Sequence, residues 1–340
     1  MKVSKIFLVI LLILSAIGRL PFTALEYIYV AIKRPKIEPI APPIFILGHW
    51  RSGTTHLYNI LSKSDKFGFV SPFSTALPWD ILLIGRILAP VLRRSLPEGR
   101  YIDNVSVNPD SPQEDEIALA NMTPLSYYQA IYFPKKFEEY FESGTYFDGL
   151  SETQISKWER TLRYLYLKLT MDQNGRRLLI KNPVYTARVA HLRRMYPDAK
   201  VIHIHRNPYK VFVSMRNFYE KLFPQFALQD YSHVDIDNVV FKTYRRMMSA
   251  LKTDTADMPD SQYVELSFDA LQADTLGEIK RIYAQLGLGD FGEDETVFTD
   301  YLATITDYKK NAFEILPELK TKIDSEWGET MALWGYGVDT

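Results

Sequence analysis

Hydrophobic residues lie along much of this chain in short runs that end at a glycine or a cation. Residues 43–47, PIFIL, are continuously apolar and stop at Gly48, which is typical of a buried parallel strand. After a short loop, Thr54 and Thr55 open a predicted helix, HLYNILS. A strand–loop–helix junction directs backbone N–H groups and a helix N-terminus at one point, where an oxyanion can bind. The first apolar run therefore predicts a phosphate- or sulfate-binding loop.

A second region, residues 176–219, alternates between strand and helix patterns. We expect strands at Leu178–Lys181 and Ala199–His205, with a helix at Thr186–Tyr196 that carries its arginines on the outside. Another helix is predicted to start at Pro208. These alternating patterns favour a doubly wound α/β fold with a mostly parallel sheet, in which ligands bind at the carboxyl ends of the strands.

The cation in the first loop distinguishes between kinds of phosphate chemistry. Gly48 and Gly53 have the spacing of the glycines in a nucleoside triphosphatase loop, but Thr54 stands where that motif has its lysine. The cation is Arg51, inside the loop. An arginine there can direct two donors at one terminal oxyanion without a metal. The alternative is a glycine-rich turn whose arginine is merely solvated.

Arg206 and Ser214 form a second candidate anion site. Arg206 leaves the end of the predicted strand Ala199–His205. Ser214 lies roughly 9 Å along the helix that begins at Pro208, within reach of the same phosphate. Together the arginine and the serine predict a monophosphate pocket.

The segments GHWRSGTTHL, LLIKNP and R-N-P-x-x-x-x-x-S resemble the sulfotransferases that use 3′-phosphoadenosine 5′-phosphosulfate, PAPS. The resemblance runs from about residue 43 to the C-terminal WGY, and the segment Tyr263–Gly287 is similar to the family's late strand and helix. It implies a three-layer, doubly wound, mostly parallel α/β fold like that of P-loop nucleoside triphosphatases. It also implies an enzyme that transfers the sulfonate of PAPS to a hydroxyl group, with PAPS as co-substrate and no metal.

The resemblance also implies roles for individual residues. Arg206 and Ser214 correspond to the site of the 3′-phosphate, and Arg51 and Lys181 correspond to the catalytic cations. Lys181 precedes Asn182-Pro183, and a proline keeps the residue before it extended, so we expect the lysine at the strand end. The alternative for Lys181 is an ordinary surface lysine. The 5′-phosphosulfate site corresponds to Arg51, Ser52, Gly53, Thr54 and Thr55.

The general base departs from the family pattern. The positions where other sulfotransferases carry a histidine or a glutamate are Pro183 and Ile180 here, and neither can take a proton. Glu114 and Asp115, within the acidic stretch that follows Ser111, are our candidates. The alternative is structural, because Ser111 with Glu114 three residues later has the spacing of a helix capping box.

Three histidines lie near the predicted site: His49, His203 and His205. The chain has no cysteine and lacks the helical histidine spacing of a metalloprotease, so we expect no metal site. We expect the histidines to be packed or hydrogen-bonded. His205, next to Arg206, is also placed to titrate near neutral pH and tune the pocket.

The N-terminus predicts a membrane segment. Residues 6–17, IFLVILLILSAI, are continuously apolar, and residues 6–32 are long enough to cross a bilayer if Arg19 and Glu26 are tolerated. Basic residues on both sides leave the orientation open. We expect an uncleaved membrane anchor or interfacial helix over residues 1–34, a proline-rich linker over 35–43 and a sulfotransferase domain over 44–340.

Composition narrows the partners and the compartment. The 340 residues suffice for one large α/β domain, and a formal net charge of −1 argues against nucleic acid. The absence of cysteine suits a reducing cytoplasm, so we predict a membrane-associated protein whose catalytic domain is cytoplasmic. The alternative is a Golgi type II protein with Asn104 and Asn121 as glycosylation sites. Oligomeric state is left open.

The acceptor is indicated only by composition. Residues 67–103, 122–146 and 215–231 are rich in aromatic side chains, which shape a substrate pocket or form core. With the membrane segment, they suggest a small-molecule or lipid acceptor, such as a sterol-like or other hydrophobic alcohol. Two rival functions are an ATP-dependent small-molecule kinase and a non-catalytic nucleotide-binding membrane protein. The lysine missing after Gly53 speaks against the kinase, whereas the missing base favours the non-catalytic protein.

Overall fold

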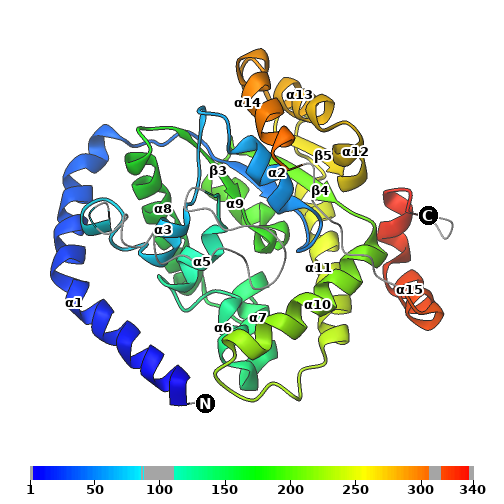
Figure 1. Cartoon of the computed structure of the whole chain (residues 1–340), viewed down its shortest axis with the longest axis horizontal. Coiled ribbons are helices and arrows are strands. Elements are labelled where there is room, and N and C mark those ends of the chain that lie inside the picture. The colour runs from blue at the N-terminus through cyan, green and yellow to red at the C-terminus, as the bar shows by residue number, and fades with distance from the viewer. Residues whose placement is uncertain (1–2, 86, 88–110, 306–314, 337–340) are drawn as a thin grey trace. The chain divides into compact units, whose positions relative to one another are not determined.

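A computed structural model of the protein describes residues 3–85, 87, 111–305 and 315–336 (Figure 1). The chain forms two compact units that interleave in sequence. The first unit comprises Met1–Ala41, Gly68–Leu178 and Lys221–Val234. The second comprises Pro42–Phe67, Leu179–Glu220 and Asp235–Thr340.

A five-stranded sheet organises the second unit. Its strands are β1 (Ile44–Leu47), β2 (Phe67–Gly68), β3 (Arg177–Lys181), β4 (Lys200–His205) and β5 (Tyr263–Ser267). Their order is β2-β3-β1-β4-β5, and β1 runs parallel to both β3 and β4. All four residues of β1 are buried, as in a sheet covered on both faces. The predicted α/β fold is confirmed, and the carboxyl ends of β3, β1 and β4 are neighbours.

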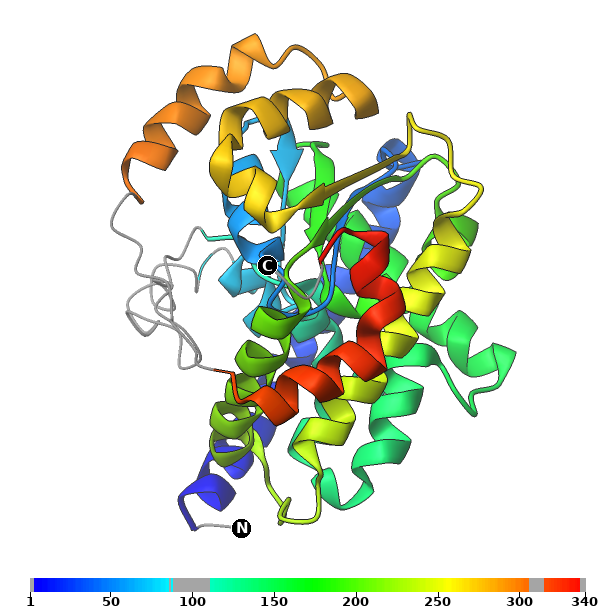
Figure 2. The same cartoon turned by 90° about the vertical axis from the view of Figure 1, so that its right-hand side faces the viewer.

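In the second unit, helices follow β1, β3, β4 and β5. Helices α12 and α13 contact β5, and α11 packs against α9 and α15, as Figure 2 shows. The Tyr244 ring of α11 stacks on Trp327 of α15 with centroids 4.0 Å apart, and the Trp327 Nε1–H donates to the Phe241 carbonyl. These helices are α2 (Thr54–Leu61), η3 (Pro183–Ala187), α9 (Val189–Met195), α10 (Pro208–Phe226), α11 (Ile236–Thr255), α12 (Phe268–Ala273), α13 (Thr275–Leu286), α14 (Gly292–Ala303) and α15 (Pro317–Leu333).

The first unit is mostly helical in the part that the structure describes. Its longest helices are α1 (Val3–Lys33) and α8 (Glu152–Asp172). Ser151 and Gln154 form a capping box at the start of α8, which buries Trp158 and Leu162. The shorter helices are η1 (Arg34–Lys36), α3 (Pro72–Ala76), α5 (Asp115–Ala120), α6 (Tyr128–Tyr132), η2 (Pro134–Lys136) and α7 (Phe137–Tyr146).

The helix expected at Thr186–Tyr196 is present as α9, Val189–Met195, after a 3-10 turn. Its Arg193 and Arg194 are at least partly exposed, as expected, but Arg188 just before it is fully buried, so that part of the prediction was wrong. The alternative of a capping box that starts at Ser111 does not describe α5, because this helix begins at Asp115 and has Glu114 at its N-cap position. The Gln113 N–H donates to the Val70 carbonyl at 2.7 Å, which holds the preceding segment outside the helix.

The N-terminal segment forms one continuous helix, α1, of 31 residues. It is the one helix within the described ranges that is long and apolar enough to cross a membrane. Of the two potential glycosylation asparagines, Asn104 lies outside the described residues. The Asn121 side-chain amide donates to the Thr75 carbonyl at 3.0 Å.

Several aromatic residues from the stretches considered for the acceptor are core. Phe137, Phe141 and Phe223 are buried in the first unit, and the Phe137 ring lies 5.4 Å from Phe141 and 5.9 Å from Phe223 between centroids. Phe218 and Tyr219 are buried in the second unit. These five rings therefore contribute to packing, and residues 88–103 of the first stretch lie outside the described residues.

Candidate functional site

The loop between β1 and α2 turns through three left-handed residues. Gly48, Arg51 and Gly53 have φ values of 148°, 71° and 100°. A Cβ on Gly48 would lie 2.4 Å from the Ile204 carbonyl oxygen, and one on Gly53 would lie 2.2 Å from Cδ2 of Phe268. Both positions therefore require glycine for its backbone and for its small size. The two glycines hold the loop close to β4 and α12.

Arg51 is unusual because a non-glycine residue seldom adopts a left-handed backbone. Its Nε donates to the Ser214 hydroxyl at 2.9 Å, and its carbonyl accepts from Arg206 NH1 at 3.2 Å. Such a conformation costs on the order of 1–3 kcal/mol and persists only where surrounding contacts hold it. The loop is thus organised around Arg51, with support from residues more than 150 positions away.

The start of α2 supplies backbone donors to the same loop. Gly53 is its N-cap residue, and its carbonyl accepts from the N–H groups of His56 and Leu57. The N–H groups of Thr54 and Thr55 belong to the first turn, where no preceding helical carbonyl is available. Together with the positive end of the helix dipole, this geometry suits an anion.

Lys181 lies at the carboxyl end of β3. The register of β3 on β1 pairs Lys181 with Ile46, and its Nζ donates to the Thr55 hydroxyl at 3.3 Å. The side chain is only 1% exposed, so the alternative of an ordinary surface lysine is wrong. The strand pairing therefore brings a second cation to the loop.

An asparagine and a proline follow each of the two cations at the strand ends, and we did not assign a role to the asparagines from the sequence. The Asn182 Oδ1 accepts from the Val184 N–H at 3.0 Å, and the Asn207 Oδ1 accepts from the Tyr209 N–H at 3.0 Å. Each asparagine therefore caps the helical turn that its proline begins. The repeated cation-Asn-Pro pattern was the signal in the sequence.

Arg206 and Ser214 both contact Arg51. The Arg206 guanidinium lies 4.7 Å from the centroid of the Phe268 ring, besides donating to the Arg51 carbonyl. Ser214 is 5% exposed and accepts from Arg51. The residues predicted for the 5′ and 3′ sites therefore meet at one place in the second unit.

Thr186 is a further residue of the site that sequence reasoning missed. It is fully buried, and its Oγ1 accepts from the Gly48 N–H at 2.9 Å. This bond fixes the first residue of the loop to the turn after β3. No motif marked Thr186, because its role depends on the pairing of β3 with β1.

The histidines are packed and hydrogen-bonded, as expected. Burial lowers the pKa of His49 to about 4, and its Nδ1 hydrogen-bonds the Trp50 carbonyl at 2.9 Å. Burial, with His203 nearby, lowers the pKa of His205 to about 4, so the expectation that it titrates near neutral pH was wrong. The cause is visible in the packing, since Trp334 stacks on the His205 ring at 4.4 Å. Within the described ranges, no group of three His, Cys, Asp or Glu could hold a metal.

The two acidic candidates belong to the first unit, whereas the cations belong to the second. Asp115 is fully buried, and its Oδ2 accepts from the Tyr166 hydroxyl at 2.7 Å. Glu114 is partly exposed and makes no side-chain cap to α5. Asp115 is therefore part of the core of the first unit.

The sequence is similar to those of known sulfotransferases. The sulfotransferase family pattern matches residues 42–292. The omega-hydroxy-beta-dihydromenaquinone-9 sulfotransferase Stf3 of Mycobacterium bovis is 30% identical over 302 residues, covering 88% of this chain and 76% of the relative. The protein of the same name from Mycobacterium tuberculosis matches to the same extent.

Solved structures share the fold. The sulfotransferase STF9 of Mycobacterium avium superposes with a TM-score of 0.72 at 15% identity, covering 90% of this chain and 80% of that one. STF1 of M. tuberculosis superposes with a TM-score of 0.59 at 19% identity, covering 77% and 72%. Because the family pattern spans most of the chain, this protein belongs to the sulfotransferase family and is a PAPS-dependent sulfotransferase.

Proposed function

We propose that this sulfotransferase transfers the sulfonate of PAPS to a hydroxyl group of a lipid alcohol, of the class of hydroxylated isoprenoid quinones. The observation that supports this acceptor most directly is the 30% identity, over 88% of the chain, to an enzyme named for a hydroxylated menaquinone derivative. The exposed apolar surface of α1 also favours an acceptor that resides in a membrane.

The donor site is proposed at the carboxyl ends of β1, β3 and β4. Arg51 and the backbone N–H groups at the start of α2 would hold the 5′-phosphosulfate, with Ser52 and Thr54 buried beneath it. Arg206 and Ser214 would hold the 3′-phosphate. In support, both of these side chains are hydrogen-bonded to Arg51. A substitution at Arg51 should therefore affect the binding of both phosphates.

The cations would act on the charge that moves during transfer. The acceptor oxygen forms a bond to sulfur as the bond from sulfur to the 5′-phosphate oxygen breaks, which requires an in-line approach. Arg51 and Lys181 would stabilise the charge on the sulfonate and leaving oxygens, each by on the order of 3 kcal/mol in a site that excludes water. Their hydrogen bonds to Ser214 and Thr55 hold the two side chains before the donor binds.

The acceptor's proton must leave as the new bond forms, and we propose Glu114 as its base. Asp115 is the less suitable of the two acids because it is fully buried and occupied by Tyr166. Glu114 is partly exposed, so an acceptor hydroxyl can approach it. Asp115 would then position α5 through its bond to Tyr166.

We also propose that the protein associates with a membrane through α1 and that its catalytic unit faces the cytoplasm. The helix is long and apolar enough for this role, and PAPS is a cytoplasmic metabolite. The mycobacterial source of the relatives favours this placement over a Golgi protein.

The donor site can be tested with 3′-phosphoadenosine 5′-phosphate and the full chain in detergent. Calorimetry should show tight binding that Arg206→Ala weakens by about 10- to 100-fold, as for a hydrogen bond to a charged group. Arg194→Ala, at an exposed arginine of α9, is the matched control and should bind like the wild type. Equal affinity of wild type and Arg206→Ala would contradict the proposed 3′ site.

The acceptor can be tested separately with labelled PAPS. The purified enzyme should sulfate an ω-hydroxylated isoprenoid quinone in micelles, and Arg51→Ala should abolish the product. Sulfation of sugars but not of hydroxylated quinones or sterols would overturn the lipid acceptor and leave the donor site intact.

A further inference from the structure

Helix α1 presents one row of side chains to the rest of the first unit. The row consists of Arg19, Thr23, Glu26 and Val30, whose spacing of four, three and four residues places them on one face of a helix. Glu26 and Val30 are 0% and 2% exposed, and Arg19 and Thr23 are partly buried. The second half of α1 is therefore attached to the folded unit.

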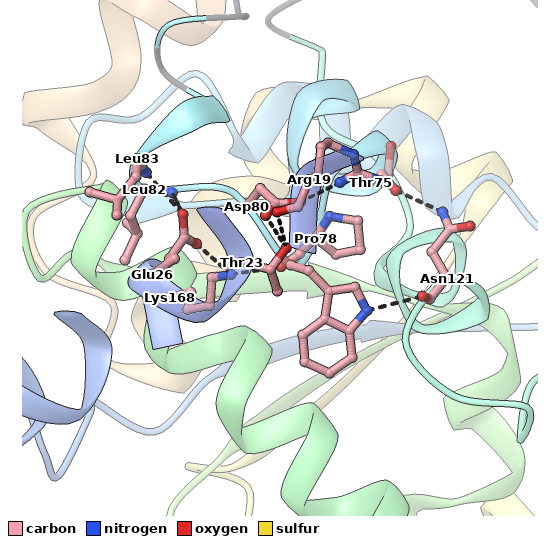
Figure 3. Close-up of polar contacts among 11 residues, drawn as sticks. Arg19, Thr23, Glu26, Thr75, Pro78, Asp80, Leu82, Leu83, Asn121 and Lys168 are labelled. Carbon is pink, nitrogen blue, oxygen red and sulfur yellow. Dashed lines mark hydrogen bonds and ion pairs between the residues drawn. The ribbon is translucent and has the colours of Figure 1, made fainter. Parts of the chain in front are cut away.

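The attachment at Glu26 is polar and fully buried (Figure 3). Its Oε1 lies 2.5 Å from Lys168 Nζ, and its Oε2 accepts from the N–H groups of Leu82 and Leu83, at 2.9 Å each. Lys168 also donates to the Pro78 carbonyl at 2.9 Å. The carboxylate of α1 thus neutralises a lysine from α8 and binds the backbone of a loop.

A second ion pair lies about two turns earlier on α1. Arg19 pairs with Asp80, which is fully buried, and the Thr23 hydroxyl donates to the same carboxylate at 2.5 Å. Figure 3 shows Arg19, Thr23 and Glu26 pointing into this cluster. Both charges of α1 that lie within its apolar stretch therefore have a partner of opposite charge in the first unit.

The remaining surface of α1 is apolar and exposed. Many of its large apolar side chains are exposed, from Phe7, at 69%, to Ile32, at 68%. Residues 10–18 are exposed all around the helix, and Arg19 is the first residue after them that is partly buried. An apolar surface of this extent is a site for another molecule rather than for water.

The ion pairs determine how α1 can meet a bilayer. A span needs roughly 20 residues. Every window of that length within Val3–Lys33 contains Arg19, and the stretch before it, Val3–Gly18, is only about 24 Å long. A hydrocarbon core is about 30 Å thick. Crossing it would therefore carry Arg19, and with it Asp80 and its loop, into the lipid.

We propose that α1 is a monotopic membrane-docking helix that enters one leaflet and does not cross the bilayer. Residues 6–18, which carry no charge, insert among the lipid chains of one leaflet, and the half from Arg19 to Lys33 lies at the interface, attached to the first unit. This inference rests on the proposed membrane association and goes beyond it in excluding a span.

A lipid bilayer suits this surface better than a second copy of the chain. A partner helix would cover one stripe of α1, whereas residues 10–18 are exposed all around. The basic run Lys33-Arg34-Pro35-Lys36 at the end of the helix matches anionic headgroups at the interface. The enzyme would then meet its lipid acceptor in the leaflet on which it sits.

The chain has no cysteine, so single cysteines can carry a spin label without further changes. We would label Ile6→Cys, Leu11→Cys, Ile17→Cys, Leu25→Cys and Ile32→Cys, all at exposed positions, in the full chain on vesicles of neutral and anionic phospholipids. Thr299→Cys, on an exposed site of α14, is the control. Accessibility to oxygen reports lipid depth, and accessibility to a soluble nickel complex reports water.

Depth should be greatest at Leu11 and Ile17, fall at Leu25 and be least at Ile32, with Thr299 in water. The monotopic arrangement alone would be overturned by a profile that is deepest near residue 19 and shallow at both ends. In that case the nickel complex would reach Ile6→Cys and Ile32→Cys from opposite sides of the vesicle. Nickel accessibility at all positions would overturn membrane association as well. Short distances between labels on two copies, without lipid depth, would assign the surface to a second copy.

Discussion

Two regions of this protein place their cations in different surroundings. At the loop of the second unit, Arg51 and Lys181 donate to the hydroxyls of Ser214 and Thr55, and Arg206 donates to a carbonyl. These bonds orient the three side chains around a loop that leads into the N-terminus of α2. That geometry suits an anion.

At α1 each cation meets a carboxylate. Arg19 pairs with Asp80, and Lys168 pairs with Glu26. These pairs are neutral as units, and they hold a helix in place rather than attract a ligand. The comparison teaches that a cation paired with a carboxylate holds two elements together, whereas cations gathered at a helix N-terminus provide the geometry of an anion site. Mutations in the two regions should accordingly affect different properties.

The largest effect is expected for Glu26→Ala. Removing one partner of a buried ion pair leaves Lys168 uncompensated, and burial already lowers the pKa of that lysine. The free energy of unfolding should fall by roughly 3–5 kcal/mol, measured by urea denaturation. Replacing both partners, Glu26→Leu with Lys168→Met, should recover much of the loss, because no charge stays buried.

Glu38→Ala is the control for this variant, since Glu38 forms an exposed ion pair with Arg34 and should matter little. Wild-type stability of Glu26→Ala would show that Lys168 finds water and that the cluster does not hold α1.

The second effect is expected for Arg51→Gly, on activity alone. Glycine adopts the left-handed backbone of residue 51 without strain, so stability should stay the same or rise slightly. Turnover should fall about 10²- to 10³-fold, as for loss of one preorganised donor. Arg51→Lys should also lose activity, because an ammonium group cannot present two parallel donors. A large loss of stability with retained turnover would reverse the roles assigned to the two regions.

The smallest effect concerns pH and the neutral histidines beside the loop. His49 and His205 have pKa values of about 4 in the folded chain, below the ordinary value of 6.5. Between these values the unfolded chain binds more protons, so stability should fall as pH drops from 6.5 to 4. Each histidine should contribute on the order of 2–3 kcal/mol over this range.

Replacing His205 by Gln should flatten that pH dependence, whereas His191→Gln, at a partly exposed site of α9, should not. An unchanged slope in His205→Gln would mean that the pKa of His205 is the same in the folded and the unfolded chain. His205 would then add a positive charge beside the loop below its ordinary pKa of 6.5.

Much of the second unit could be predicted from the sequence. Its strands are short apolar runs with clear ends, and the observed β1, β3 and β4 differ from the predicted segments by one residue at most. The sequence also predicted the glycines at 48 and 53 and the cations at the strand ends, because local backbone chemistry determines their positions. The family pattern is carried by these local features.

Other features depended on tertiary contacts. The burial of Arg188 was mispredicted, because the surrounding packing encloses it. Sequence reasoning left the role of Ser111–Glu114 open, and the helix starts at Asp115, after a hydrogen bond from Gln113 to Val70. The low pKa of His205 arises chiefly from burial, and Trp334, far along the chain, stacks on its ring. Sequence reasoning could not place such partners.

By itself the sequence determined the α/β fold, the anion-binding loop and the apolar character of the N-terminal segment, because each depends on residues that are close together along the chain. Only the tertiary structure decided that Arg51 is held left-handed by contacts with Ser214 and Arg206, and that Arg19 and Glu26 have buried partners on α1's protein-facing side. The physical reason is that a charge is tolerated or functional according to what surrounds it, and folding brings those surroundings from distant parts of the chain.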